Sequence, residues 1–214
     1  MIINRSFSSS LSNKERFGSL KSLVLLVVIA ILATNNTYAQ ASFETIGGLS
    51  YLIYPDAKTA TLTVTHGKKY SGNIVVPEKV KASDGVEYPV TAFGDNAFKE
   101  CGGLQSITIP SSVTSLGNSC FEWCEGLTSI TIPSSVTSLG DYCFYECSGL
   151  TSINIPSSVI SLGQSCFEGC SYLTSITISS SVTSLCKRCF EFWNFIEKFA
   201  NVTFQECGTS KVKK

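Results

Sequence analysis

The sequence repeats itself with a period of 23 residues. The segment "SITIPSSVTSLGNSCFEWCEGLT" (106–128) is followed directly by "SITIPSSVTSLGDYCFYECSGLT" (129–151), and further copies begin at residues 152 and 175. A partial copy, "VTAFGDNAFKECGGLQ" (90–105), precedes them. Because one copy is too short to bury its own apolar face, successive copies are expected to stack and share a continuous core. The repeat therefore predicts a solenoid.

Each copy is expected to form a strand and a short helix. Ile107 and Ile109 are two residues apart, so both point inward from a strand, which Pro110 ends because it lacks a backbone donor. The two cysteines and the phenylalanine of "CFEWC" (120–124) have the spacing of one helix face. A period of about 20 to 29 residues with a leucine and isoleucine skeleton is typical of leucine-rich repeats. We therefore predict an α/β leucine-rich-repeat solenoid with a parallel β-ladder on one face and short helices on the other.

The repeat also carries a family resemblance. "SITIPSSVTSLGNSCFEWC" resembles the BspA-like leucine-rich-repeat family, whose repeats read I-x-I-P-x-x-V-x-x-I-G-x-x-A-F-x-x-C, and the lead-in "KKYSGNIVVPEKVKASDGVEYPVTAFGDNAF" is similar to that family's N-terminal segment. The resemblance spans residues 42–186 and implies a secreted or surface-exposed bacterial protein that binds other proteins, often host or matrix proteins. Two features depart from the family pattern. Cysteine replaces the usual alanine in each copy, and the last copy has Cys186 for glycine and Trp193 for the second cysteine.

Four regions are expected along the chain. Residues 1–39 are predicted to be a signal peptide, 40–89 a β-rich N-terminal cap, 90–196 the BspA-like repeats, and 197–214 a C-terminal cap with a mobile tail. Caps are expected because an open solenoid exposes its core at both ends. In the first cap, "TATLTVTH" alternates as a half-buried strand does, and "SDG" indicates a turn between two short strands. The aromatic segment "CFEFWNFIEKFANVTF" is interpreted as a cover for the last repeat, with an exposed surface for a partner or membrane as the alternative.

The N-terminus has the pattern of an export signal. The apolar run "LVLLVVIAILA" follows several basic residues and is followed by small residues around Ala39. An uncleaved membrane anchor is the alternative, but the run has 11 residues, fewer than the roughly 20 that a spanning helix needs. We therefore expect an exported protein, secreted or at the cell surface with the periplasm as a further location, and no transmembrane segment after cleavage.

The distribution of charge excludes one class of partner. The formal net charge is zero, and residues 101–185 contain five acidic side chains and no lysine or arginine. A nucleic-acid-binding domain needs a basic face to neutralise phosphates. We therefore expect no nucleic-acid partner for the repeats.

Ten cysteines in an exported chain raise the question of disulfides. Eight of them fall in two columns at the repeat period: Cys120, Cys143, Cys166, Cys189 and Cys101, Cys124, Cys147, Cys170. Both columns take inward positions, and free cysteine packs as a small hydrophobe, so buried thiols are the favoured interpretation. The second interpretation is that disulfides join adjacent turns. The third is a zinc site, although the recurring C-x3-C spacing differs from the C-x2-C pairs common in structural zinc sites.

Catalytic patterns are missing from the sequence. The chain has one histidine, His66, next to an expected turn and without an orienting partner or a nucleophile motif. No glycine-rich phosphate loop is present, because the recurring glycines follow the repeat period. We therefore predict no enzyme, no cofactor and no metal; an enzyme would require an unusually reactive His66 or cysteine.

Two surfaces are candidates for partner binding. The outward strand positions barely vary and should form a flat, uncharged, hydroxyl-lined face. The helix side varies between copies and holds large aromatic residues, which are preferred binding anchors; the alternative is that these aromatics pack singly on neighbouring turns. The candidate residues are Thr108, Thr131 and Asn154 on the strand face, and Trp123, Tyr142, Tyr145, Glu146 and Tyr172 on the helix side.

Together these observations predict an exported, non-enzymatic binding protein. Its expected role is protein–protein interaction or adhesion at the cell surface, with a host, matrix or cell-envelope protein as partner. A glycan-binding surface is the alternative, because serine and threonine hydroxyls near tyrosine and tryptophan suit sugars.

Overall fold

The computed structural model describes residues 41–65, 67–182, 184–185 and 188–189. The chain divides into two compact units, residues 1–39 and 40–214, and all described residues belong to the second unit. The predicted signal peptide, His66 and the predicted C-terminal cap at 197–214 lie outside the described residues. The four predicted region boundaries therefore stay predictions.

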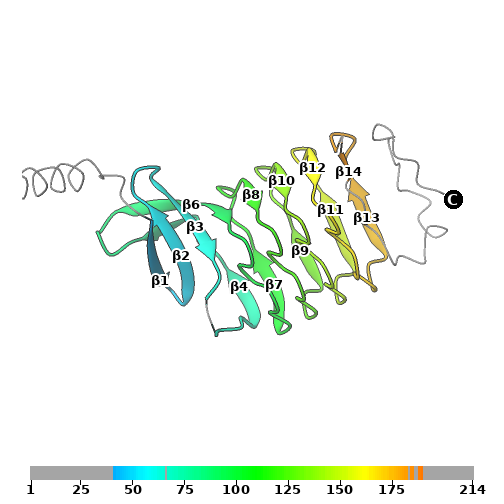
Figure 1. The fold of residues 1–214 in the computed structure, drawn as a ribbon, viewed down its shortest axis with the longest axis horizontal. Helices are drawn as coiled ribbons and strands as arrows, with labels where there is room; N and C mark the ends of the chain where they lie inside the picture. The colour runs from blue at the N-terminus through cyan, green and yellow to red at the C-terminus, as the bar shows by residue number, and fades with distance from the viewer. Residues whose placement is uncertain (1–40, 66, 183, 186–187, 190–214) are drawn as a thin grey trace, which may run out of the picture. The chain divides into compact units, whose positions relative to one another are not determined.

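The first part of the described chain consists of short strands, as the sequence predicts. Strands β1 (Ser42–Ile46), β2 (Leu49–Tyr54) and β3 (Thr59–Thr63) form an antiparallel meander. Strands β5 (Lys79–Lys81) and β6 (Glu87–Phe93) form a hairpin around the expected "SDG" turn. Strand β3 also pairs with β6 in parallel, and this pairing joins the meander to the repeats (Figure 1).

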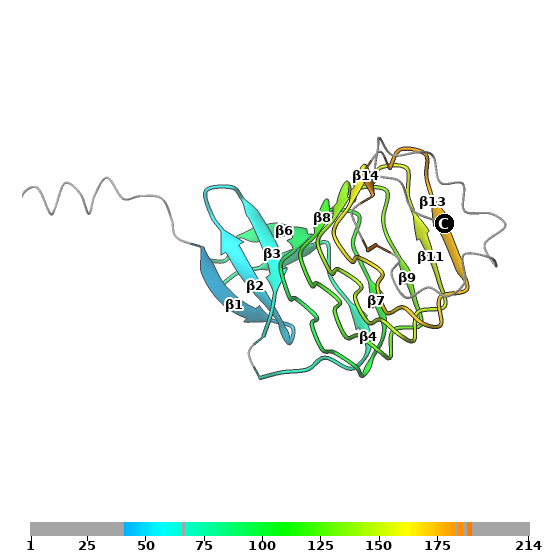
Figure 2. The same ribbon diagram turned by 45° about the vertical axis from the view of Figure 1, so that its right-hand side comes forward.

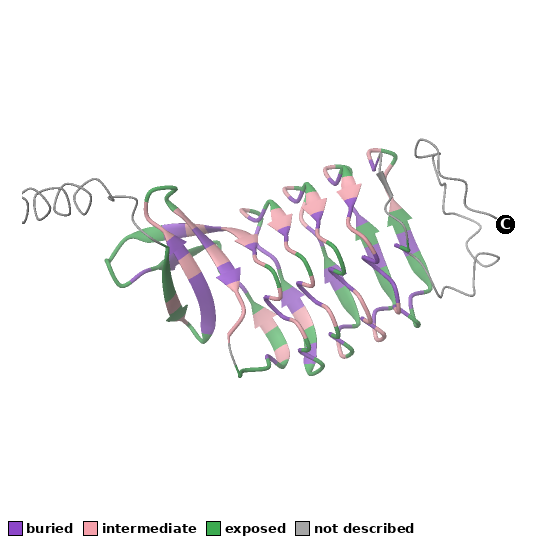
Figure 3. Ribbon diagram, viewed as in Figure 1, coloured by how far each residue is buried: buried purple, intermediate pink, exposed green. Residues whose placement is uncertain are grey.

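A first parallel ladder runs along the repeats. It consists of two consecutive parallel sheets along the same side of the repeats, one of β4 (Gly72–Val75) and β7 (Leu104–Thr108), the other of β9 (Ser129–Thr131), β11 (Ser152–Ile155) and β13 (Ser175–Ile178). Strand β4 pairs with β7, and β11 pairs with both β9 and β13, all in parallel. Ile107 and Ile109 are buried and Thr108 is exposed, which confirms the predicted alternation (Figure 3).

A second parallel ladder was not expected from the sequence. It consists of two-residue strands at the "SL" of each copy: β8 (Ser115–Leu116), β10 (Ser138–Leu139), β12 (Ser161–Leu162) and β14 (Ser184–Leu185). Strand β8 pairs with β6, so this ladder and the N-terminal strands form one nine-stranded sheet. Serine hydroxyls add to the connection between turns: Ser135 Oγ donates to the Val113 carbonyl and Ser158 Oγ to the Val136 carbonyl, both at 2.6 Å.

The third side of each turn is not helical, and the predicted short helices are wrong. The described residues contain no helix, and "CFEWC" lies in a series of tight turns (Figure 2). The physical reason is the direction of its backbone bonds. Phe121 N–H donates to the Cys143 carbonyl at 2.8 Å and Trp123 N–H to the Tyr145 carbonyl at 2.9 Å, so these groups bond the next turn and not the carbonyl four residues back. We call this side, residues 95–103, 118–126, 141–149 and 164–172, the turn face.

Phenylalanine rings form the centre of the core. The rings of Phe98, Phe121, Phe144 and Phe167 stack nearly parallel along the repeats, with centroids 5.3 to 5.4 Å apart and interplanar angles of 2° to 7°. All four are fully buried. Because each ring contacts its counterpart in the next turn, the turns are held at one spacing and one register.

The cysteine columns lie beside this stack as buried free thiols. All eight column cysteines are free and buried, which agrees with the favoured interpretation and not with disulfides between turns. Cys147 Sγ donates to the Phe121 carbonyl at 3.0 Å. Burial raises the pKa of the Cys170 thiol to about 12 and holds the pKa of Cys147 and Cys166 well above the usual range. Cys147, Cys166 and Cys170 are therefore protonated and unreactive in the folded protein.

We expect the eight column thiols to react only after unfolding. In a variant with Cys186→Ser and Cys207→Ser, a disulfide reagent at about pH 8 should label native protein at the rate of global unfolding, because all eight column thiols are buried and shielded from the reagent until the chain unfolds. In denaturant without reductant, all eight thiols should react. Fast labelling of the native variant, or fewer than eight thiols in denaturant, would contradict this structure.

The close approach of successive turns makes Gly140 a sensitive position. A Cβ added there would lie 2.5 Å from the Gly117 carbonyl carbon and 2.6 Å from the Asn118 nitrogen, both backbone atoms. We expect Gly140→Ala to lower the free energy of unfolding by about 2 kcal/mol, the usual scale of overpacking. Gly102→Ala is the matched control, because a Cβ there meets no atom within 4 Å. Urea denaturation of both variants measures the difference, and equal midpoints would refute the predicted contact.

Candidate functional site

The candidate residues of the strand face lie where the sequence places them. Thr108, Thr131 and Asn154 are all exposed on the first ladder. Asn154 is in register with Thr131 on one side and Thr177 on the other, so the outward side chains form a row across the strands. Since the row contains no charged residue, this face offers hydroxyl and amide groups without a net electrostatic field.

The turn face is organised as three columns of side chains, each at the 23-residue period. The first column is Asn96, Ser119, Tyr142, Ser165 and Arg188; the second is Lys99, Glu122, Tyr145 and Glu168; the third is Glu100, Trp123, Glu146 and Gly169. Residues of the first and third columns have positive φ, for example 57° at Tyr142 and 60° at Trp123. This left-handed conformation costs a non-glycine residue about 1 to 2 kcal/mol. The backbone hydrogen bonds between turns hold the residues in it.

Three of the candidate aromatic residues form a cluster on the turn face. The ring of Tyr145 contacts Trp123 at 6.0 Å and Tyr142 at 5.7 Å between centroids, in edge-to-face geometry. Trp123 is 40% exposed and Tyr142 37% exposed. The rings therefore pack against one another, and the Trp123–Tyr145 contact joins two neighbouring turns, as expected if these aromatics serve packing. Trp123 and Tyr142 nevertheless present part of their surface to solvent. We call Trp123, Tyr142 and Tyr145 the aromatic cluster.

The other two candidates on this side take different positions. Tyr172 is 69% exposed, makes no ring contact within the described part of the chain, and occupies the repeat position of Gly126 and Gly149, outside the three columns. Glu146 lies against Gly169, where an added Cβ would be 2.7 Å from either carboxylate oxygen. Glu146 lies close enough to Tyr145 to raise its pKa, and within the described residues no ring contact joins Tyr172 to the aromatic cluster.

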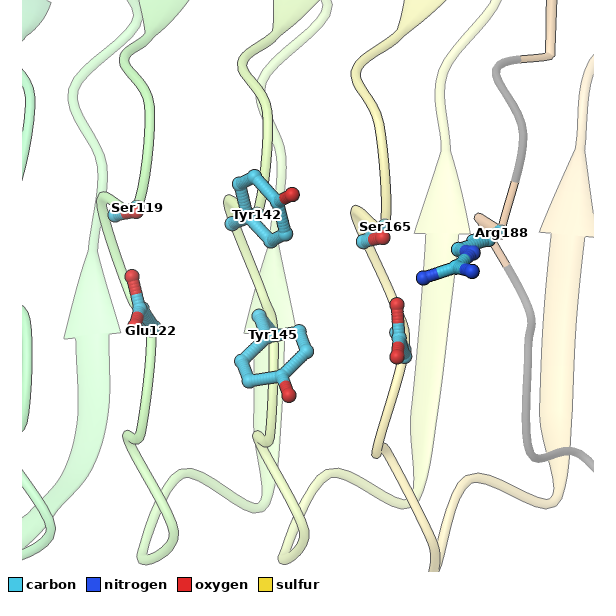
Figure 4. A pocket seen from close by; sticks show the side chains of 7 residues that line it. Ser119, Glu122, Tyr142, Tyr145, Ser165 and Arg188 are labelled. Atoms are coloured by element: carbon cyan, nitrogen blue, oxygen red, sulfur yellow. The ribbon is translucent and has the colours of Figure 1, made fainter.

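A pocket of about 470 Å³ opens on the turn face beside the cluster (Figure 4). Its lining residues are Ser119, Glu122, Tyr142, Tyr145, Ser165, Glu168 and Arg188. The small side chains of Ser119 and Ser165 flank Tyr142 in the first column, which leaves room on both sides of the ring. Glu168 was not among the predicted site residues, and it is only 8% exposed. Aligning the copies in columns would have placed it beside Tyr145.

Several carboxylates lie around the aromatic cluster and the pocket. Burial raises the pKa of Tyr145, and the neighbouring carboxylates Glu146, Glu168 and Glu122 raise it further. Burial and then Glu168 raise the pKa of Glu146 in the same way. Glu122 forms an ion pair with Lys99 at 3.0 Å. The carboxylate contributions to both shifts agree with these glutamates lying close to Tyr145.

The described residues contain no group of histidine, cysteine and carboxylate side chains arranged to hold a metal ion. Within the same residues, no helix has the length and apolar character needed to cross a membrane.

Several solved structures resemble the chain. A leucine-rich repeat protein from Bacteroides capillosus is 28% identical, with a TM-score of 0.55, covering 64% of this chain and 99% of its own. A leucine-rich repeat protein from T. pallidum is 27% identical, with a TM-score of 0.60, and the match covers 69% of this chain and 66% of that protein. A leucine-rich cell surface protein from Faecalibacterium prausnitzii is 28% identical, with a TM-score of 0.53, and the match covers 66% of this chain and 44% of that protein.

No curated protein matches the chain. The family model described as "BspA type Leucine rich repeat region (6 copies)" matches residues 91–212, more than half of the sequence. The matched residues include strands β7 to β14, the whole phenylalanine stack and the whole turn face. On this match and on the fold, the chain belongs to the BspA-type leucine-rich-repeat family.

Proposed function

We propose that this protein is an exported, non-enzymatic binding protein that contacts another protein through its turn face. The observation that carries the proposal is the aromatic cluster, in which two partly exposed aromatic side chains contact a third. Membership of a leucine-rich-repeat family supports a role in protein interaction. Exposed tryptophan and tyrosine are the side chains most enriched at the centres of protein interfaces.

The aromatic cluster is also held rigidly, which favours tight binding. Tyr142 N–H donates to the Gln164 carbonyl at 2.7 Å, and Trp123 N–H donates to the Tyr145 carbonyl. Each ring of the cluster then contacts another ring. Because backbone and rings are already ordered, binding would lose little conformational entropy.

The proposed location is outside the cytoplasm, secreted or at the cell surface. Two lines support it: the export signal predicted at residues 1–39, and the likeness to a leucine-rich cell surface protein of Faecalibacterium prausnitzii. A partner in the host, the matrix or the cell envelope fits this location, and adhesion is the role that such binding would serve.

Removal of the cluster tests the proposal. A partner is first identified on an array of host, matrix and cell-envelope proteins. Trp123→Ala with Tyr145→Ala should then weaken its binding at least about tenfold, because truncating interface aromatics commonly costs more than 1 kcal/mol each. The control is Thr131→Ala with Asn154→Ala on the strand face, which should bind normally. If the cluster variant keeps both its unfolding midpoint and its affinity, the turn face is not the site.

Glycan binding at the strand face is the second candidate, favoured by the row of exposed, uncharged side chains. Neighbouring strands lie about 4.8 Å apart, so the row presents hydroxyl groups at regular intervals. If a glycan array gives a ligand, the strand-face variant should lose it and the cluster variant should keep it. The same pair of variants therefore separates the two functions, and the reverse pattern would exclude a glycan site here.

A further inference from the structure

The acidic residues of the central repeats are all on one side. Residues 101–185 contain no lysine or arginine, and their five acidic residues are Glu122, Glu125, Asp141, Glu146 and Glu168. Every one of them belongs to the turn face. The two strand ladders carry no charge over the same span. An approaching partner therefore meets a negative field on the same face as the aromatic cluster.

Ion pairing on this face stops part of the way along the repeats. Lys69 Nζ pairs with Glu100 at 2.7 Å, and Lys99 Nζ pairs with Glu122 at 3.0 Å. The later acids Glu146 and Glu168 have no ion pair or side-chain hydrogen bond among the described residues. Among the described residues, lysines thus pair with the first acids of the turn face, whereas Glu146 and Glu168 form no ion pair, although Arg188 lines the same pocket as Glu168.

Glu168 is the most unusual of these acids. It is 92% buried, given its exposure of 8%, and it lines the pocket of Figure 4. Among the described side chains only the Tyr51 hydroxyl is fully buried without a hydrogen-bond partner, so the unpaired carboxylate oxygens of Glu168 stay open to the pocket and to a cation that enters it. This side chain is therefore an independent indication, beyond the acidic composition, that the pocket accepts a positively charged group.

The walls of the pocket suit the same kind of group. Tyr142 and Tyr145 line it together with Glu168, so a cation can contact an aromatic ring and a carboxylate at once. The chain makes both contacts elsewhere: Lys68 Nζ lies 5.1 Å from the ring centroid of Tyr70, and Lys99 pairs with Glu122 in the same column as Glu168. A planar guanidinium makes both contacts better than an ammonium group does.

We infer that this pocket receives an arginine or lysine side chain from a positively charged segment of the protein partner. Glu168 is the counter-ion, and Tyr142 and Tyr145 form the aromatic wall. The inference rests on the proposed function and narrows it, because it assigns the chemistry of the partner at this site. Arg188 also lines the pocket, and its positive charge opposes a second cation.

Short labelled peptides test this on the full chain. Fluorescent octaarginine, octalysine and an uncharged glycine–serine octapeptide are titrated by anisotropy at low and at physiological salt. We expect octaarginine to bind more tightly than octalysine, the uncharged peptide not to bind, and affinity to fall with salt. Binding of all three peptides alike, or of none, would overturn the inference.

Matched charge variants locate the binding. Glu168→Gln should weaken octaarginine binding at least about tenfold, since a charge-assisted hydrogen bond to a desolvated carboxylate is lost. Glu87→Gln removes the same charge from an exposed position on β6 and should change affinity less than about twofold. Arg188→Gln should tighten binding, because it removes the like charge. If Glu168→Gln and Glu87→Gln weaken binding equally, the binding depends on net charge alone and the pocket is not a specific site.

A second variant keeps the test valid if Glu168→Gln does not fold. Tyr142→Ser introduces the residue found at the same column position in both neighbouring turns, where φ is 52° and 50°. It should preserve the unfolding midpoint and lower octaarginine affinity several-fold. Unchanged affinity in this variant would refute the aromatic wall. If no cationic peptide binds but the array partner still depends on the aromatic cluster, this inference fails and the proposed function stands.

Discussion

The structure depends on backbone hydrogen bonds that run from one turn to the next. On the turn face, the N–H groups of Phe98, Phe121 and Phe144 donate to carbonyls 22 residues later in the chain. A single turn cannot satisfy these donors, and a buried donor without a partner is costly. The absence of helix from the described repeats follows, as do the left-handed residues and the uniform stacking of the phenylalanine rings. Most side chains of the three columns reach the surface, and Ser165 and Glu168 are the buried exceptions.

The sequence was sufficient to predict the solenoid, the first ladder and the buried thiols, because each depends on the spacing of apolar residues. It was insufficient on the turn face, since the spacing of Cys120, Phe121 and Cys124 fits a helix and a series of turns equally well. The second ladder was missed because two-residue strands show no alternation. Of the candidate site, the exposure of Trp123 and Tyr142 was foreseeable, but the burial of Glu168 depends on how adjacent turns pack.

Constant and variable positions have separate physical tasks in these repeats. Several of the recurring serines and threonines bond the preceding turn, as Thr151 Oγ1 does with the Thr128 carbonyl and Ser135 Oγ with the Val113 carbonyl. The variable residues, such as Tyr142 between Ser119 and Ser165, lie in columns whose backbone conformation does not depend on the side chain. A binding surface can therefore change on this scaffold without a change in the core or in the ladders.

The direction of the bonds between turns has a consequence for the length of the stack. On the turn face, N–H groups point toward the following turn, as Ser119 does toward Asp141. Beside the second ladder they point toward the preceding turn, as Gly140 does toward Leu116. The peptide dipoles of the two sides therefore oppose each other, unlike those of an α-helix, which add into a macrodipole. Turns can be added without charge accumulating at the ends, and gene duplication can lengthen such a protein at little electrostatic cost.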